Sequence, residues 1–353
     1  MLRVADSGLT PPVWHLSASA ALAERHRAGL TPDTLRFQIF PPCALLGRHQ
    51  VLAQEIDADW CAAHGVTVAR RVTGGGAIVM APGILGWELL LPAGLFPRGL
   101  GEAAARICTA AAAGVSSLGV DARFRPRNDI EAAGRKIGGT GGYFDGPTLL
   151  YQGTVIVALD RALLRNALRW PGDKLARHGA EGIEERVTDL AALLPQPPAM
   201  AAVKTALADA LARELGYGLA PGELDADEVA ATERLARDEI GDADFIAGPA
   251  PPREGRVLSA TRRTPGGALT VHLKLRPGGD GVIEAALFTG DGFVNPPRVF
   301  NDLEAALKDA TLSDCALLAR DFLHASGASF LGCAIDDVAA ALADAIKGWK
   351  DNA

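Results

Sequence analysis

Two adjacent arginines followed closely by three glycines form the stretch of this sequence best suited to chemistry. Arg70 and Arg71 end a short run of alternating apolar residues, a pattern that predicts a strand stopping at a loop with Thr73 and glycines 74–76. Because glycine has no side chain, such a backbone can adopt positive φ angles and let an anion approach its N–H donors. A phosphate is therefore a candidate ligand, although a tight turn also explains a glycine triplet. The spacing matches neither a Walker A loop nor a dinucleotide motif.

A lysine inside a short strand pattern is the second candidate. Residues 124–157 contain three stretches of strand character separated by glycine-bearing turns, and Lys136 lies in the second stretch. The three stretches are residues 129–131, 135–138 and 151–157. A charged side chain within a strand commonly lies on a solvated face, and Asn128 and Asp129, where the first stretch begins, commonly form a turn or cap. These structural roles remain alternatives to a functional one.

Activating a carboxylic acid with a nucleotide requires a cationic loop, a carboxylate and a fixed ammonium group. Carboxylates are poor acyl donors, and forming an acyl adenylate requires a cation near the α-phosphate, a divalent metal on the departing pyrophosphate and an orienting pocket. Arg71 would supply the cation, Asp129 could hold magnesium, and Lys136 could contact the acyl oxygen and the phosphate at once. Adenylate chemistry is therefore the activity that these residues favour.

Length and composition describe a globular protein with more than one domain. The chain of 353 residues is long enough for two domains, and its apolar content of 48% and charged content of 22% are ordinary for a soluble protein. The net charge of −7 argues against nucleic acid as the main partner and against a basic membrane-binding surface. The most apolar stretch, residues 75–96, is interrupted by prolines, glycines and Glu88, so no membrane span is expected.

The cysteines are widely spaced and form no C-x-x-C pair or zinc-type group. They are Cys43, Cys61, Cys108, Cys315 and Cys333. An odd, scattered set is typical of reduced thiols in a cytosolic protein, and the N-terminal residues lack the pattern of a secretory signal. A cytoplasmic location is therefore expected.

A proline-rich segment at residues 245–256 is the clearest linker, and it predicts a larger domain at 1–245 and a smaller one at 246–353. The smaller domain shows three strand patterns followed by three helical patterns. The main expected strands are residues 35–40, 84–91, 256–262, 268–275 and 281–288, and the main expected helices are residues 18–28, 102–118, 161–168, 200–215, 224–240, 301–310, 313–326 and 335–347. Residues 170–188 lack periodicity and are a candidate lid or linker.

Four segments in order resemble the lipoate-protein ligases, a family that shares its fold with the biotin-protein ligases. The segments are PPCALLGRHQ (41–50), RRVTGGGA (70–77), NDIEAAGRKIGGTG (128–141) and QGTVIV (152–157). The C-terminal part also resembles the accessory domain of this family. The resemblance covers nearly the whole chain and implies an α+β fold, with a large mixed-sheet catalytic domain of the class II synthetase-like type and a small C-terminal α+β domain.

The resemblance implies a role for individual residues. Lys136 corresponds to the lysine that contacts the acyl carbonyl and the α-phosphate, and Asn128 and Asp129 correspond to nucleotide and magnesium contacts, with Asp129 as the metal ligand. The remaining residues implied to bind ATP or the lipoyl-adenylate are Arg71, Thr73, Gly74, Gly75, Gly76, Ala77, Gly139, Gln152, Gly153 and Thr154. An apolar tunnel for the acyl chain is expected near Ile78, Leu85 and Val155, by pattern only.

The implied reaction has two steps. The carboxylate of lipoate attacks the α-phosphate of ATP and magnesium pyrophosphate leaves; the lysine amine of an acceptor protein then attacks the lipoyl-adenylate. The implied cofactors are ATP and Mg²⁺, and the implied partner is a lipoyl-domain or other lipoate-binding acceptor protein, with the enzyme itself a monomer.

The sequence departs from the family pattern in two places, so other functions remain alternatives. Met80 and Ala81 occupy positions where most relatives have His-Asp, and Gln152 replaces a histidine before Gly-Thr. Glutamine cannot titrate near neutral pH, so a proton-transfer role there is not expected. One alternative is a specialised ligase branch that serves a lipoate-binding protein of sulfur oxidation, which rests on analogy.

Other activities of this superfamily remain alternatives. An ATP-independent lipoyl or octanoyl transferase forms a cysteine thioester, but the sequence has no cysteine between Cys108 and Cys315. Biotin ligases usually carry a GRGRxGR-type loop, which GRKIGGTGG (134–142) is not. A non-catalytic binder of the adenylate is a further alternative, suggested by the two departures.

Overall fold

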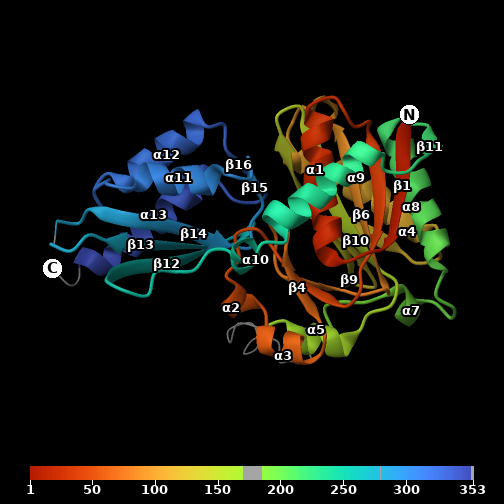
Figure 1. Ribbon diagram of the computed structural model, residues 1–353, viewed down its shortest axis with the longest axis horizontal. Coiled ribbons are helices and arrows are strands. Elements are labelled where there is room, and N and C mark those ends of the chain that lie inside the picture. The colour runs from red at the N-terminus through yellow and green to blue at the C-terminus, as the bar shows by residue number, and fades with distance from the viewer. Residues whose placement is uncertain (170–184, 279, 351–353) are drawn as a thin grey trace. The chain divides into compact units, whose positions relative to one another are not determined.

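The computed structural model describes residues 1–169, 185–278 and 280–350, in two compact units (Figure 1). The N-terminal unit comprises Met1–Leu46, Ala53–Val72 and Ala77–Ile246, and the C-terminal unit comprises Gly47–Leu52, Thr73–Gly76 and Ala247–Ala353. The units thus divide after Ile246, one residue beyond the expected domain boundary. Two short segments that were expected in the larger domain group instead with the C-terminal unit. Most of the candidate lid, residues 170–184, lies outside the described residues.

The N-terminal unit is built on a mixed sheet, which has eight strands among the described residues. In spatial order these are β11 (Leu219–Pro221), β1 (Leu2–Leu9), β2 (Thr34–Ile39), β6 (Ile84–Pro92), β10 (Thr148–Ile156), β9 (Arg135–Asp145), β8 (Asp129–Ala132) and β7 (Ala122–Arg125). Strand β1 runs parallel to β2 and β11, and the other neighbours are antiparallel. The expected α+β class with a mixed sheet is confirmed.

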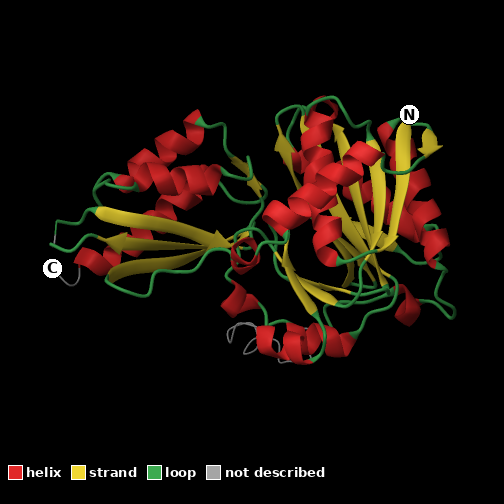
Figure 2. Cartoon of the chain, in the orientation of Figure 1, coloured by secondary structure: helices red, strands yellow, loops and turns green. Residues whose placement is uncertain are grey.

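Helices cover both faces of this sheet (Figure 2). Helix α1 (Pro12–Arg27) contacts β6 and β10, whereas α4 (Leu100–Ser116) contacts β7, β8 and β9 and packs against α8 (Met200–Leu215). This explains why β6 is apolar along almost its whole length, since a strand covered on both faces has no solvent side. Successive side chains of β10 therefore point alternately toward α1 and toward α4.

A smaller sheet in the same unit carries the strand before the glycine loop. It consists of β4 (Thr67–Arg70), β3 (Cys43–Leu46) and β5 (Ile78–Met80), with β3 between the other two. Shorter α-helices among the described residues before the C-terminal sheet are α2 (Leu52–Glu55), α3 (Ala58–Ala63), α5 (Arg161–Ala167), α7 (Leu190–Leu193), α9 (Ala226–Leu235) and α10 (Ala243–Ala247).

One expected break in the sheet is wrong. The glycines after Lys136 predict a turn, but β9 continues through them to Asp145, and the turn comes at Gly146 and Pro147. A Cβ on Gly138 would lie 2.3 Å from the carbonyl oxygen of Thr154, and one on Gly142 would lie 2.2 Å from that of Leu150. These glycines occupy strand positions where a neighbouring backbone comes too close for a side chain.

The C-terminal unit has the three antiparallel strands and three helices expected from its sequence. The strands β12 (Arg256–Thr264), β13 (Gly267–Leu275) and β14 (Ile283–Gly290) form one sheet, beside which lie α11 (Val299–Leu307), α12 (Cys315–Ala325) and α13 (Ile335–Lys350). A separate two-stranded ladder joins β15 (Val294–Asn295) to β16 (Ser329–Phe330). The core of the unit is formed by apolar residues of these strands and helices.

None of the helices in the described part of the chain has the length and apolar character needed to cross a membrane.

Candidate active site

Lys136 and Asp129 form an ion pair on neighbouring strands of the large sheet. The Nζ atom of Lys136 on β9 lies 2.6 Å from Oδ1 of Asp129 on β8, and both side chains are partly exposed. Gly139 is the register partner of Asp129. A Cβ on Gly139 would lie 2.7 Å from the Lys136 Nζ, so the lysine can reach the carboxylate only because residue 139 has no side chain. The structure thus brings together three residues that the sequence had singled out.

The backbone of Lys136 is held by a segment that follows much later in the chain. The Lys136 N–H donates to the carbonyl of Arg186 (2.9 Å), and the Thr188 N–H donates to the carbonyl of Lys136 (2.8 Å). Val187, between them, forms a parallel bridge with Lys136. These bonds fix the strand position from which the ammonium group projects.

Asn128 lies in the turn before β8 and is tied to β9 by its own amide and backbone. Its Nδ2 donates to the carbonyl of Thr140 (2.6 Å), and its carbonyl accepts bonds from the N–H (2.8 Å) and Oγ1 (3.0 Å) of Thr140. The Thr140 hydroxyl also lies 2.7 Å from the Tyr151 hydroxyl and 3.0 Å from Sγ of Cys108. The turn that carries Asn128 and Asp129 is therefore anchored through the sheet to α4.

The motif residues on β10 divide between the two faces of the sheet. Gln152 bonds to Ser19 of α1, and Oγ1 of Thr154 accepts a bond from the Gly139 N–H (3.2 Å). Gly153 lies on the other face, where its Cβ would come within 2.2 Å of the Trp87 ring. Gln152 and Thr154 therefore share a face with Gly139 and Asp129, whereas Gly153 leaves room for a buried tryptophan.

A buried ion pair next to Gln152 is the main polar feature that the sequence motifs did not predict. Arg36 and Glu88 are fully buried, with Nε of Arg36 2.6 Å from Oε1 of Glu88. The other oxygen of Glu88 accepts bonds from Ser19 (2.6 Å) and from Nε2 of Gln152 (2.9 Å). Burial, together with the Arg36 charge, lowers the pKa of nearby His15 to about 4 and keeps it neutral. The sequence feature that could have indicated this pair is one charged residue within each of two mainly apolar strands.

The two arginines before the glycine loop have different surroundings. Arg70 is buried, and its Nε donates to the carbonyls of Phe245 (3.0 Å) and Ile246 (3.2 Å). Arg71 is partly exposed and donates from its side chain to the carbonyl of Leu45 (3.0 Å). Desolvation by the surrounding protein and the charge of neighbouring Arg70 lower the pKa of Arg71 to about 10, so it remains a cation at neutral pH.

The glycine loop itself belongs to the C-terminal unit. Thr73, Gly74, Gly75 and Gly76 group with that unit, whereas Arg71 and Ala77 on either side of them belong to the N-terminal unit. Gly75 has a φ of 95°, which confirms the positive angle expected for this loop.

Two of the positions that depart from the family pattern, Met80 and Ala81, are buried. Met80 on β5 is 2% exposed and is the register partner of Cys43, and Ala81 is also buried. Of the three residues expected along an acyl tunnel, Ile78 packs at the edge of the same core as Met80. Leu85 and Val155 are register partners that point, like Gly153, to the face away from Gln152 and Thr154.

None of the cysteines of the N-terminal unit is exposed. Cys43, Cys61 and Cys108 are all fully buried, and desolvation raises the pKa of each thiol. In the C-terminal unit, burial raises the pKa of Cys315 and of the partly exposed Cys333 to about 11. At neutral pH all five side chains are therefore thiols rather than thiolates.

Solved structures share the fold of this chain. A bipartite lipoate protein ligase from Thermoplasma acidophilum, described together with its E2 lipoyl domain, superimposes with a TM-score of 0.62 at 21% identity, covering 71% of this chain and 97% of that one. P. falciparum LipL1 in complex with lipoate gives a TM-score of 0.70 at 16% identity, covering 91% and 94%. The fold is thus that of the lipoate ligases.

Sequence comparison identifies the family. Residues 11–212 match the model of the lipoyl protein ligase A/B catalytic domain, and the chain therefore belongs to this family. Octanoyltransferase LipM of Symbiobacterium thermophilum is 28% identical over 262 residues, covering 68% of this chain and 95% of LipM. Lipoate-protein ligase LplJ of Bacillus subtilis is 24% identical over 265 residues, covering 73% and 76%. The resemblance found in the motifs is confirmed, and the protein is an enzyme of the lipoate ligase and octanoyltransferase family.

Proposed function

We propose that this protein is an ATP-dependent lipoate-protein ligase, which converts lipoate to lipoyl-AMP and transfers the lipoyl group to a lysine of an acceptor protein. Its relatives include both octanoyltransferases and ligases. The choice between the two activities must therefore rest on residues of this chain. The observation that carries the proposal is the environment of its cysteines.

A transferase of this superfamily holds its acyl group as a thioester, and such a cysteine needs an accessible thiol with a lowered pKa. Cys108 is the thiol bonded to the network behind Asn128, but it is fully buried and its pKa is raised by desolvation. Cys43 and Cys61 are equally buried. The N-terminal unit thus offers no thiol suited to acyl transfer, which favours activation by ATP.

The ion pair of Lys136 and Asp129 also supports the proposal of an ATP-dependent ligase. An ammonium group on a fixed strand can stabilise the negative charge that develops on the acyl carboxylate and the α-phosphate during adenylation. Its present partner, Asp129, holds it by one contact of 2.6 Å at a partly exposed position, so substrate oxygens can replace that contact. Arg71, which stays cationic, is the second positive charge assigned to the phosphate.

Asp129 also fits a role as a ligand for magnesium. This ion is usually held by one or two carboxylates together with substrate phosphates. The nucleotide phosphates would supply the remaining oxygen ligands. A magnesium ion bound there would neutralise charge on the departing pyrophosphate.

In the first step the lipoate carboxylate attacks the α-phosphate of ATP and pyrophosphate leaves, giving the lipoyl-adenylate. In the second step the lysine ε-amine of the acceptor attacks the acyl carbon, forming an amide and releasing AMP. The acceptor is a lipoyl-domain or other lipoate-binding protein, and the enzyme acts as a monomer in the cytoplasm.

Lipoate-dependent exchange of labelled pyrophosphate into ATP tests the first step. Transfer of mass-tagged lipoate to a panel of lipoyl domains, with ATP supplied or withheld, tests the second. A ligase gives exchange and gives transfer only with ATP. Transfer of octanoyl groups from an acyl carrier protein without ATP, with no exchange, would instead assign this chain the activity named for the LipM relatives.

A further inference from the structure

The first two glycines of the loop at residues 73–76 are packed against a turn of the C-terminal unit. A Cβ on Gly74 would lie 2.3 Å from the carbonyl oxygen of Gly292 and 3.2 Å from Cα of Phe293. The Gly75 N–H donates a long hydrogen bond of 3.4 Å to the same carbonyl. Gly76 differs, because a Cβ there would meet only the Cβ of Asp291 at 3.9 Å. The absence of a side chain at residue 74 is therefore required by another segment of this protein.

A second loop packs against the glycine loop in the same way. A Cβ on Gly47 would lie 1.9 Å from the carbonyl oxygen of Gly75, and the Arg48 N–H donates to the carbonyl of Thr73 (2.9 Å). The carbonyl of His49 accepts a bond from the Gly290 N–H (3.0 Å). The loop at residues 47–50 thus bonds on one side to the glycine loop and on the other to the end of β14.

The turn at residues 291–293 is itself fixed by the hairpin between β12 and β13. Oδ1 of Asp291 accepts a bond from the Ala268 N–H (2.6 Å), and the Asp291 N–H donates to the Ala268 carbonyl (3.3 Å). Gly267, which precedes Ala268, has a φ of +128°, and its Cβ would lie 2.3 Å from Oδ1 of Asp291. A continuous series of close backbone contacts therefore runs from this hairpin to the glycine loop.

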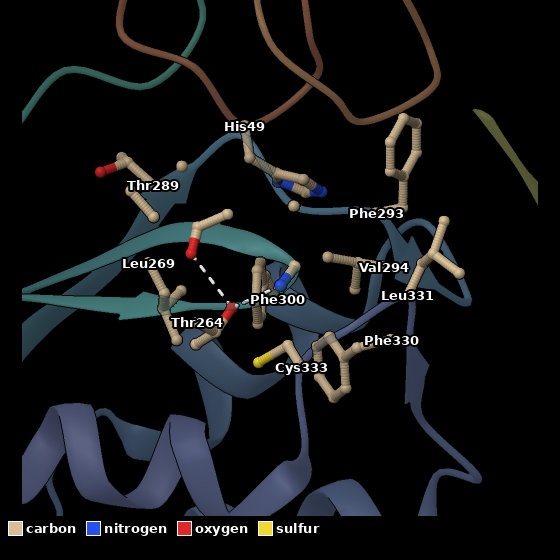
Figure 3. A pocket seen from close by; sticks show the side chains of 15 residues that line it. His49, Thr264, Leu269, Thr289, Phe293, Val294, Phe300, Phe330, Leu331 and Cys333 are labelled. Carbon is tan, nitrogen blue, oxygen red and sulfur yellow. Dashed lines mark hydrogen bonds between the residues drawn. The ribbon is translucent and has the colours of Figure 1, made fainter. Parts of the chain in front are cut away.

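The cavity beside this turn is too small to be a ligand site of its own (Figure 3). Its volume is about 20 Å³, room for roughly one water molecule. His49 and Phe300 line it, with their rings 5.2 Å apart, and the Thr264 hydroxyl within it is bonded to the backbone at residues 266 and 267. Packing, rather than binding, accounts for the arrangement of side chains around the turn.

We propose that the turn at residues 291–293 is a positioning element for the glycine loop, and that Asp291 sets the affinity for the acyl substrate without contacting it. A run of three glycines has many conformations, and ordering it on binding would weaken affinity. The contacts from Gly292 to Gly74 and Gly75 order the loop beforehand. This inference rests on the proposed function in one respect, namely that the glycine loop contacts the acyl group or its adenylate.

Replacing Asp291 by alanine tests the inference on the full-length protein. Asp291→Ala removes the bond to the Ala268 N–H, and we expect the KM for lipoate in pyrophosphate exchange to rise by about tenfold while kcat changes less than about threefold. Asp291→Asn keeps an acceptor oxygen and is expected to restore the wild-type KM. Asp302→Ala, at an exposed position on α11, is the matched control and should leave both constants unchanged.

Hydrogen exchange of the Arg48 and Gly290 amides gives a readout that does not depend on activity. These amides bond to Thr73 and His49, and we expect both to exchange faster in Asp291→Ala than in the wild type. Unchanged exchange would overturn the proposal, because the turn would not order the loop. Faster exchange with an unchanged KM would also overturn the proposal, because ordering of the glycine loop would then have no effect on substrate binding.

A second variant tests the same contact in case Asp291→Ala does not fold. A second assay separates the inference from the proposed function. If Asp291→Ala does not fold, Gly74→Ala displaces the same contact directly and carries the same expectation and the same contrary outcomes. If the wild type gives no pyrophosphate exchange, the ligase proposal fails. The variants are then compared by their KM for octanoyl-carrier protein in acyl transfer, where an unchanged KM would overturn the role of the turn.

Discussion

At the scale of single residues, the proposed adenylation assigns the central role to the ammonium group of Lys136. Replacing Lys136 by alanine is expected to abolish adenylate formation, with a loss of at least about 10²-fold, because removing one preorganised donor to a developing negative charge typically has that effect. The fold should persist, since the side chain is partly exposed. Pyrophosphate exchange and a thermal unfolding curve measure the two effects. Lys204→Ala, which breaks an ion pair with Asp6, is the control; unchanged exchange in Lys136→Ala would contradict the assignment.

Gly139 is expected to matter for activity more than for stability. A Cβ at residue 139 would come too close only to the flexible end of Lys136, so Gly139→Ala should move the ammonium group and lower kcat by about tenfold with little change in the melting temperature. Gly142→Ala, on the same strand, is the contrasting variant. Its Cβ would meet the backbone of Leu150 at 2.2 Å, so the protein should be destabilised. Equal loss of stability in both variants would argue that Gly139 has only a structural role.

At the scale of secondary structure, one row of side chains across β2, β6 and β10 links α1 to the motif residue Gln152. Replacing Glu88 by leucine leaves the Arg36 charge buried without its partner, which should lower the free energy of unfolding by about 3–5 kcal/mol. The double variant Arg36→Met, Glu88→Leu should recover most of this loss. Urea unfolding measures both, and no recovery in the double variant would show that the single variant acts by disturbing packing.

Helix α11 carries a carboxyl group whose titration should affect the stability of the C-terminal unit. Burial raises the pKa of Glu304 from 4.5 to about 7, although its Oε1 accepts a bond from the Phe288 N–H. Between pH 4.5 and 7 the folded unit binds this proton more tightly than the unfolded chain does. The free energy of unfolding should therefore fall as the pH rises through this window, by about 3 kcal/mol in total.

Unfolding curves measured at several pH values check this expectation. Glu304→Gln cannot titrate but can still accept the Phe288 bond, so the fall in stability between pH 4.5 and 7 should be smaller in this variant by the Glu304 contribution. Identical pH profiles for the wild type and Glu304→Gln would contradict the raised pKa.

At the scale of the whole molecule, the burial of the thiols provides a test of the proposed ligase activity against the transferase alternative. Four of the five cysteines are buried, and desolvation raises the pKa of every one. Treating the native protein with iodoacetamide at neutral pH should therefore leave ATP-dependent transfer intact. Cys108→Ser, which retains a hydroxyl for the Thr140 and Tyr151 bonds, should also stay active. Loss of transfer in either experiment would favour a thioester mechanism.

The sequence predicted the elements of the C-terminal unit well, because its strands and helices are regular and separated by glycine turns. It did not predict β1, whose apolar pattern is interrupted by Asp6, Ser7 and Gly8. It also misplaced the turn after Lys136, because glycine normally ends a strand and only the contact with β10 shows why it is tolerated in β9.

The sequence motifs by themselves predicted that Lys136, Asp129 and Gly139 belong to one site, and the structure places the three close together on adjacent strands joined by a short turn. The motifs also predicted the family, which the comparisons confirm, and the proline-rich segment predicted the approximate position of the linker. Tertiary structure alone decided that Arg36 and Glu88 form a buried pair beside Gln152, and that the glycine loop groups with the C-terminal unit. Those contacts join residues that are far apart in the chain. They are determined by strand register and backbone packing, which no local sequence pattern encodes.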